Sequence, residues 1–328
     1  MDEQASVPTA QSDVEASFVE ACRMLEGSPA PGEVKRAVGL LGAASAGGSG
    51  GASEILALFE AMGIVAPKNW DRSFDLLKLA AEQGSVSAKT QLLLLANPAD
   101  EPDLSLESDW DAVREAISID RLLEPKGRIA LADRPRIRII EGFASAHECN
   151  WLIERARPRL QRAKVIRESG EHGIDDYRSN TGASFQVMQM DVVLEVLRNR
   201  IAAATRVPLP LFEPTQVLHY GVGEQFAPHF DFVDPANESH HAELRELGQR
   251  IATFLVYLND AFEGGETEFP RVDIRYRGRT GDAIFWANVD DDGQPEQLSY
   301  HAGRPPLSGE KWILSQWIRD RMRTPSAS

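Results

Sequence analysis

The sequence predicts an α+β protein in which an all-α helical-repeat domain precedes a double-sheet β-domain, a jelly roll, with flanking helices. Apolar residues recur at helical spacing before residue 124, whereas short β-prone segments bounded by turn residues dominate after residue 215. The charge also changes near Pro125: residues 1–125 carry 9 basic and 21 acidic side chains, and the remainder carries 26 and 29. We therefore expect two domains, residues 1–124 and residues 125–328.

Helix pairs account for the first predicted domain, after an opening helix over 14–25. The segment LLGAASAG at 40–47 recurs 37 positions later as LKLAAEQG at 77–84, and each copy leads into a second apolar helix. Small residues let the paired helices pack closely, and a glycine ends the first helix of each pair. The segment 109–123 supplies a third, less regular pair. The alternative is an ordinary helical domain, because a solenoid usually needs about three repeats.

The second predicted domain begins with a strand and two helices. Residues 137–140 favour a strand because they are mostly β-branched. Ser145 and Glu148 have the spacing of a capping box, which predicts the start of a helix. Residues 191–205 form another amphipathic helix, and the polar stretch 169–179 is expected as a loop.

Eight strands are expected in the rest of the chain, and their turn-separated order is typical of a jelly roll. The expected strands are 216–220, 225–231, 251–259, 266–269, 272–276, 283–286, 298–301 and 311–318.

Three residues in these strands form a pattern suited to metal binding. Successive side chains of a strand alternate between its faces, so His229 and Asp231 project from the same face. His301 lies in a later short strand and supplies a second imidazole. Two imidazoles and one carboxylate form the facial triad of non-haem Fe(II) oxygenases. The alternative, a buried set of polar residues without metal, would leave costly unsatisfied groups.

A lysine follows His301 after ten residues. In the strand 311–318, Lys311 shares a face with Ile313, Ser315 and Trp317. This places one cation against an apolar lining, an arrangement suited to the distal end of a dicarboxylate.

From Arg136 to Arg319 the chain resembles the prolyl 4-hydroxylase-like dioxygenases that depend on 2-oxoglutarate and Fe(II). Four ordered segments carry the resemblance: HYGVGEQFAPHFD, RIATFLVYLND, GGETEFP and HAGRPPLSGEKW. The resemblance implies a double-stranded β-helix with helices on its outer side. It also implies that His229, Asp231 and His301 bind Fe(II) and that O2, 2-oxoglutarate and ascorbate are used.

The resemblance implies further roles around the metal. Lys311 is expected to pair with the 5-carboxylate of 2-oxoglutarate, while Tyr220 and Thr253 help to hold this cosubstrate. Arg178 and Trp286 match positions that line the peptide groove, although Trp286 is equally plausible as a core residue. The loops 167–176 and 233–248 would close over the substrate. The residues that follow Arg178 and the pair Pro305–Pro306 differ from the family's pattern, which leaves the peptide specificity open.

The first half of the chain resembles Sel-like, tetratricopeptide-related repeats, with AAEQG in the second copy as the best match. The first copy departs from the pattern through its additional glycines. This resemblance implies a protein-binding role, and the acidic repeats would suit a basic partner.

The expected function is therefore hydroxylation of a C–H bond, most favourably of prolyl residues in a peptide or protein, with release of succinate and CO2. Two alternatives remain open: hydroxylation of another side chain or a small molecule, and a catalytically idle protein-interaction module. The acidic first half argues against nucleic acid or an anionic membrane as partner. Two cysteines, no apolar membrane span and no signal-peptide pattern predict a cytoplasmic protein.

Overall fold

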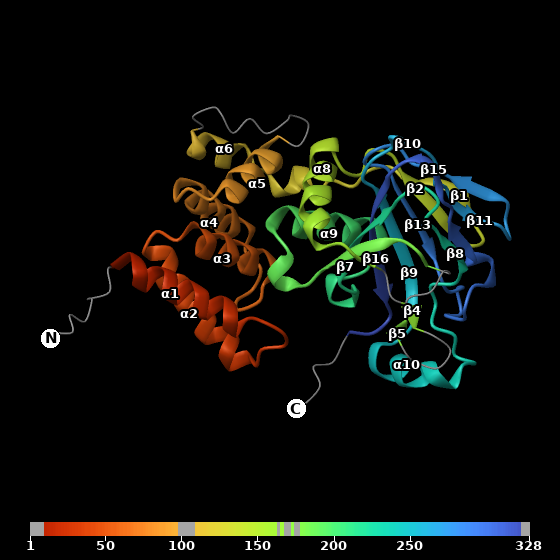
Figure 1. The fold of residues 1–328 in the computed structure, drawn as a ribbon, viewed down its shortest axis with the longest axis horizontal. Helices are drawn as coiled ribbons and strands as arrows, with labels where there is room; N and C mark the ends of the chain where they lie inside the picture. Colours follow the sequence, from red (N-terminus) through yellow and green to blue (C-terminus); the bar gives the residue numbers. More distant parts are fainter. Residues whose placement is uncertain (1–9, 98–108, 163–164, 167–171, 174–177, 323–328) are drawn as a thin grey trace, which may run out of the picture. The chain divides into compact units, whose positions relative to one another are not determined.

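The computed structural model describes residues 10–97, 109–162, 165–166, 172–173 and 178–322 (Figure 1). The chain forms two compact units. The first combines Met1–Glu124 with Val187–Leu197, and the second combines Pro125–Gln186 with Arg198–Ser328. Helices build the described part of the first unit, and helices with antiparallel sheets build the second. The protein is thus of mixed α/β type, while the assignment of two separate domains stays a prediction.

Consecutive helices pack against one another in the first unit. They are α1 (Ala10–Met24), α2 (Pro31–Ala46), α3 (Gly50–Met62), α4 (Trp70–Glu82), α5 (Val86–Ala96), α6 (Trp110–Ala116) and α7 (Ile119–Leu122). The segment expected at 109–123 is two short helices, because the chain is extended at Ile117, where α6 ends. Ser118 then caps α7 by accepting a hydrogen bond from the Arg121 N–H at 3.4 Å.

The turns between α2 and α3 and between α4 and α5 have the same structure. Ser49 and Ser85 cap the second helices, and each hydroxyl accepts a hydrogen bond from the backbone N–H three residues later. Gly48 and Gly84 precede them with φ values of +96° and +93°, in a region that favours glycine. These positions are 36 residues apart. The repeat offset of 37 residues expected from the sequence is therefore wrong by one. The sequence comparison aligned the two segments at their first leucine, whereas the helix caps align them one position earlier.

All strand pairs of the second unit are antiparallel, in an eight-stranded sheet and a four-stranded sheet. In spatial order the large sheet contains β1 (Ile129–Ala132), β2 (Ile137–Ile140), β13 (Ala283–Ala287), β9 (Arg250–Tyr257), β16 (Lys311–Arg319), β7 (Thr215–Tyr220), β6 (Thr181–Phe185) and β3 (Gln161–Arg162). The small sheet contains β12 (Ile274–Tyr276), β11 (Thr267–Phe269), β14 (His301–Gly303) and β8 (Phe226–His229). Two further strand pairs are β10 (Phe262–Gly264) with β15 (Pro306–Gly309), and β4 (Val165–Ile166) with β5 (His172–Gly173).

Each of the eight expected segments contains a strand, but 298–301 does so only at its end. There a 3-10 helix, Gln297–Ser299, precedes β14, which begins at His301. The sequence did not indicate β10 and β15, because their glycine and proline content is typical of turns. Within the described part of the chain, these two short strands pair only with each other.

Two longer helices accompany the sheets, α8 (Ala146–Ala156) and α9 (Val192–Thr205), together with the short α10 (His241–Leu247). The capping box expected at the start of α8 is confirmed by hydrogen bonds of 3.1 and 2.8 Å between Ser145 and Glu148. Helix α9 belongs to the first unit up to Leu197. The remaining 3-10 helices are Arg157–Arg159, Val187–Gln189, Leu209–Leu211 and Glu238–His240.

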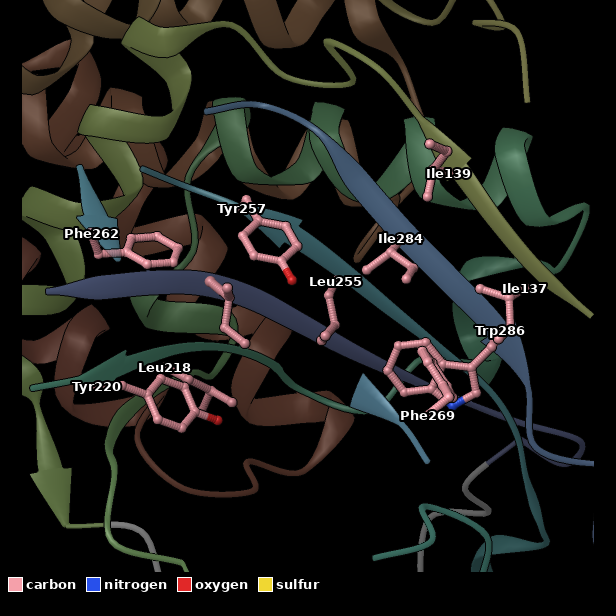
Figure 2. Packing of buried hydrophobic residues seen from close by; sticks show 11 residues of the cluster. Ile137, Ile139, Leu218, Tyr220, Leu255, Tyr257, Phe262, Phe269, Ile284 and Trp286 are labelled. Atoms are coloured by element: carbon pink, nitrogen blue, oxygen red, sulfur yellow. The ribbon is translucent and has the colours of Figure 1, made fainter. Parts of the chain in front are cut away.

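The core of the second unit lies between its two sheets. The large sheet contributes most of the buried side chains, and β11 contributes Phe269 from the small sheet. Figure 2 shows Phe269 beside Trp286, with ring centroids 5.1 Å apart and the rings edge to face. The members of this core are Ile137, Ile139, Leu218, Tyr220, Leu255, Tyr257, Phe262, Phe269, Ile284, Trp286 and Ile313. Among the described residues, no helix has both the length and the apolar composition needed to cross a bilayer.

Candidate active site

Two segments that are distant in sequence bring three residues together beside the core. His229 ends β8 and His301 begins β14, and the antiparallel register places them opposite each other. Their ring centroids are 4.3 Å apart. The Asp231 carboxylate oxygens lie 3.5 Å from His229 Nε2 and 3.4 Å from His301 Nε2. The three expected ligands therefore meet, and their ligand atoms all lie within 4.8 Å of one another.

Hydrogen bonds orient both imidazoles toward the centre of this cluster. His229 Nδ1 lies 2.8 Å from the Ala227 carbonyl oxygen, and His301 Nδ1 lies 2.9 Å from the Ser299 carbonyl oxygen. A carbonyl oxygen only accepts, so each Nδ1 carries the proton and each Nε2 keeps its lone pair. Both lone pairs are thus available to a metal.

The charges of the cluster suit a divalent cation. Burial opposes ionisation of Asp231, but the imidazoles of His301 and His229 and the Thr253 hydroxyl hold the pKa of this carboxyl below its usual range. Burial lowers the pKa of His301 to about 4; His229 adds to this effect and Asp231 opposes it. At neutral pH an ionised carboxylate therefore faces a neutral imidazole, the forms in which both residue types bind metals.

Thr253 forms a hydrogen bond with Asp231, one of the three candidate metal ligands. Its hydroxyl donates a hydrogen bond to Asp231 Oδ2 at 2.6 Å, and Asn288 Nδ2 donates to the same hydroxyl oxygen at 2.9 Å. The hydroxyl hydrogen is therefore directed at Asp231, and the expected role of Thr253 in holding the cosubstrate stays a prediction. Nothing in the sequence around Asn288 had indicated a position next to the site.

Lys311 is buried in the pocket that contains the three candidate ligands. It is 0% exposed, and its Nζ has no hydrogen-bond partner among the described residues. Nζ lies 5.1 Å from the ring centre of Tyr220 and 5.5 Å from that of Tyr257. Burial lowers the pKa of Lys311 to about 7, with Glu266 opposing the shift. A buried amine without a partner is costly, so the pocket suits a ligand that brings a carboxylate.

Alternation along β16 shapes one wall of this pocket. Lys311, Ile313, Ser315 and Trp317 all line it, as expected from their common face. The pocket encloses about 400 Å³, including the part that is open to solvent.

Arg178 and Trp286 also line the pocket, but both are buried. Arg178 Nε donates to Asn180 Oδ1 at 3.0 Å, and its guanidinium lies 4.5 Å from the ring centre of Phe226. The Trp286 ring lies 4.5 Å from that of His301, and its Nε1 has no acceptor among the described residues. Trp286 therefore supports a candidate ligand from within the core, rather than standing at an open surface.

Sequence reasoning missed Tyr257, although a signal was present. Thr253, Leu255 and Tyr257 alternate along β9 and share a face. The Tyr257 hydroxyl lies 2.8 Å from Thr267 Oγ1 and donates to the Tyr276 carbonyl oxygen at 2.9 Å, which fixes its ring beside Lys311.

The two loops expected to close over the substrate differ in what can be described. Most of 167–176 lies outside the described residues, whereas 233–248 contains the 3-10 helix Glu238–His240 and α10. Closure of either loop stays a prediction.

Comparison with known proteins finds prolyl 4-hydroxylases among the relatives of this chain. The sequence profile of the 2OG-Fe(II) oxygenase superfamily matches residues 215–319. Over 205 residues the chain is 31% identical to probable prolyl 4-hydroxylase 10 of Arabidopsis thaliana, covering 56% of this chain and 69% of the relative. It is 34% identical over 203 residues to prolyl 4-hydroxylase 1 of the same plant, covering 57% and 70%. A crystal structure of the viral collagen prolyl hydroxylase of Paramecium Bursaria Chlorella virus-1 with 2OG is 27% identical, covers 57% of this chain and 98% of that one, and has a TM-score of 0.44.

Proposed function

The chain belongs to the prolyl 4-hydroxylase-like 2OG-Fe(II) oxygenases, and from this premise we propose that its buried pocket hydroxylates prolyl residues of a peptide or protein. One observation carries the proposal. A triad of two histidines and an aspartate shares a pocket with Lys311, whose buried Nζ has no partner among the described residues. The triad fits Fe(II), and the lysine fits the distal carboxylate of 2-oxoglutarate.

Each residue in the proposed site has a defined task. His229, Asp231 and His301 would hold Fe(II) from one side and leave the opposite side open to 2-oxoglutarate and O2. Lys311 would pair with the distal carboxylate, and the Tyr220 ring would cover that end of the pocket. When bound, iron and 2-oxoglutarate supply the oxidising chemistry that consumes O2 and releases succinate and CO2.

The remaining pocket residues exclude water and hold the ligands in place. Trp286 packs against His301, and Phe226 lies under Arg178. Arg178 uses only Nε for its hydrogen bond to Asn180, and its two terminal nitrogens carry four further N–H groups, so we propose a contact role for it at the substrate end of the pocket. Ascorbate would keep the metal reduced, as is typical of prolyl hydroxylases.

We also propose that the second unit is a double-stranded β-helix of the jelly-roll type. Its two antiparallel sheets enclose one core; the small sheet supplies the histidines, and the large sheet supplies Lys311. In the first unit, two turns with equivalent caps 36 residues apart support the Sel-like repeats. These acidic repeats would bind a basic segment of a protein partner or substrate.

The test incubates the protein with Fe(II), 2-oxoglutarate, ascorbate and a library of proline-containing peptides. Mass spectrometry then follows the addition of one oxygen, and succinate is measured in parallel. We expect hydroxyproline in proportion to succinate and neither product from His301→Ala. Oxygen found only on other residues would reject prolyl specificity, and an absence of succinate from every reaction would reject the oxygenase activity itself.

A further inference from the structure

A buried row of hydrogen bonds leads away from Asp231. Thr253 Oγ1 lies 2.6 Å from Asp231 Oδ2, and Asn288 Nδ2 lies 2.9 Å from Thr253 Oγ1. The three residues are 4%, 1% and 0% exposed, respectively. They come from three separate parts of the second unit: Asp231 follows β8, Thr253 lies in β9, and Asn288 follows β13. The row therefore connects the candidate metal site to the large sheet.

The chemistry of the three groups fixes the direction of both hydrogen bonds. An ionised carboxylate only accepts, so the single hydroxyl hydrogen of Thr253 must point to Asp231. The hydroxyl oxygen then offers only its lone pairs to Asn288, whose amide nitrogen donates. The carboxamide orientation of Asn288 is thereby fixed, and the hydroxyl of Thr253 is prevented from rotating toward another acceptor.

The backbone holds Asn288 in place on both sides. Its N–H donates to the Ile251 carbonyl oxygen at 2.8 Å, and its carbonyl oxygen accepts from the Glu296 N–H at 2.9 Å. Its side-chain Oδ1 is buried and has no hydrogen-bond partner among the described residues. A buried carbonyl without a partner costs free energy. An asparagine side chain with no partner but Thr253 among the described residues thus points to a task for its amide nitrogen.

We propose that Asn288 and Thr253 are positioning residues for the Asp231 metal ligand. The torsion that rotates a carboxylate about its terminal bond is broad, so a free aspartate samples many orientations. The Thr253 hydroxyl fixes Oδ2, which holds the carboxylate with Oδ1 3.5 Å from His229 Nε2 and Oδ2 3.4 Å from His301 Nε2. Asn288 acts one step further out, by fixing the hydroxyl. This inference rests on the proposed function, because it assumes that Asp231 binds the metal.

The proposal predicts an order of metal affinities among variants of Thr253 and Asn288. Thr253→Val keeps the shape of the side chain but removes the hydroxyl, whereas Thr253→Ser keeps the hydroxyl. Asn288→Ala removes the donor behind Thr253. Loss of a residue that orients a metal ligand typically weakens metal binding about 10- to 100-fold. We expect Thr253→Val to show this loss, Thr253→Ser to remain near wild type, and Asn288→Ala to lie between them.

The test measures Co(II) binding to the full-length protein without 2-oxoglutarate, by calorimetry and by the visible absorption of bound Co(II). The double variant Thr253→Val/Asn288→Ala should bind no more weakly than Thr253→Val alone, because Asn288 acts through Thr253. A purely structural role would lower the unfolding temperature of Thr253→Val but leave its Co(II) affinity and spectrum like those of the wild type. Wild-type affinity and spectrum in Thr253→Val would overturn the proposal.

Two variants keep the test decisive, one if Thr253→Val fails to fold and the other if Asp231 is not a metal ligand. If Thr253→Val does not fold, Asn288→Ala decides, since it leaves Thr253 and Asp231 intact; an unchanged Co(II) affinity and spectrum would then reject the proposal. Asp231→Ala separates this inference from the proposed function. Weak binding in Asp231→Ala with normal binding in Thr253→Val rejects only the positioning role. Normal binding in Asp231→Ala rejects the ligand assignment and the positioning role with it.

Discussion

The helical unit and the oxygenase pocket both bury polar side chains, but they differ in whether these side chains have hydrogen-bond partners. In the helical unit, Gln91 is 0% exposed and fully engaged: its Nε2 donates to Glu54 Oε1 at 2.7 Å, and its Oε1 accepts from the Val192 N–H at 3.0 Å. In the pocket, Lys311 is equally buried, yet its Nζ has no partner among the described residues. A satisfied buried network stabilises a fold, whereas an unsatisfied buried donor marks a place where a ligand completes the structure.

The strongest test of this contrast removes a candidate metal ligand. His301→Ala should reduce succinate formation by at least about 100-fold, because loss of a ligand should exceed the effect of losing an outer residue. His219→Ala is the matched control, since His219 Nδ1 lies 3.2 Å from Thr181 Oγ1 and its ring lies 4.4 Å from the tilted ring of Trp312. Comparable activity losses in both variants would contradict the assignment of His301.

Replacement of Lys311, whose Nζ has no hydrogen-bond partner among the described residues, should weaken 2-oxoglutarate binding and at the same time raise the stability of the protein. Lys311→Met should weaken 2-oxoglutarate binding about 10- to 100-fold, because a hydrogen bond to a charged group contributes about 1.5–3 kcal/mol. It should also raise the unfolding temperature of the ligand-free protein by roughly a few degrees, since a buried amine without a partner is removed. Calorimetry and thermal unfolding measure the two effects.

A second cation provides the control for this experiment. Arg304 is exposed and lies 3.4 Å from Glu268, so Arg304→Ala should change neither quantity appreciably. If Arg304→Ala, and not Lys311→Met, weakened 2-oxoglutarate binding, the anchor would be Arg304.

The affinity for 2-oxoglutarate should also depend on pH. The pKa of Lys311 is lowered to about 7 chiefly by burial. Below pH 7 the amine is a cation that can pair with a carboxylate; above it the amine is neutral and must first be protonated. The dissociation constant should therefore rise up to about tenfold per pH unit above 7. Lys311→Arg should bind less tightly at pH 7 but lose this dependence, because a guanidinium stays charged. A flat profile in the wild type, measured by calorimetry, would contradict the prediction.

The smallest effect is expected in the helical unit. Gln91→Ala should lower the free energy of unfolding by about 1–3 kcal/mol, because it leaves Glu54 and the Val192 N–H with one partner fewer. Metal and 2-oxoglutarate affinities of the folded protein should not change. A Gln91→Ala variant with normal stability and weakened 2-oxoglutarate binding would contradict this prediction.

Because Val187–Leu197 belong to the helical unit, a chain shortened to begin at Pro125 would lose the partners of that segment.

Local periodicity in the sequence was enough for much of the site. Alternation along single strands placed Lys311, Ile313, Ser315 and Trp317 on one wall, and the capping box predicted the start of α8 correctly. These features depend on residues a few positions apart, whose relative directions follow from backbone geometry alone.

Only the tertiary structure decided how distant residues meet. The pairing of β8 with β14 places His301 directly opposite His229, across 72 positions of sequence. The packing of β9 brings the Thr253 hydroxyl to Asp231 and Tyr257 beside Lys311. The assignment of Val187–Leu197 to the helical unit is of the same kind. Such contacts depend on strand order and on the packing of the whole core, and the local pattern around each residue is compatible with many such arrangements.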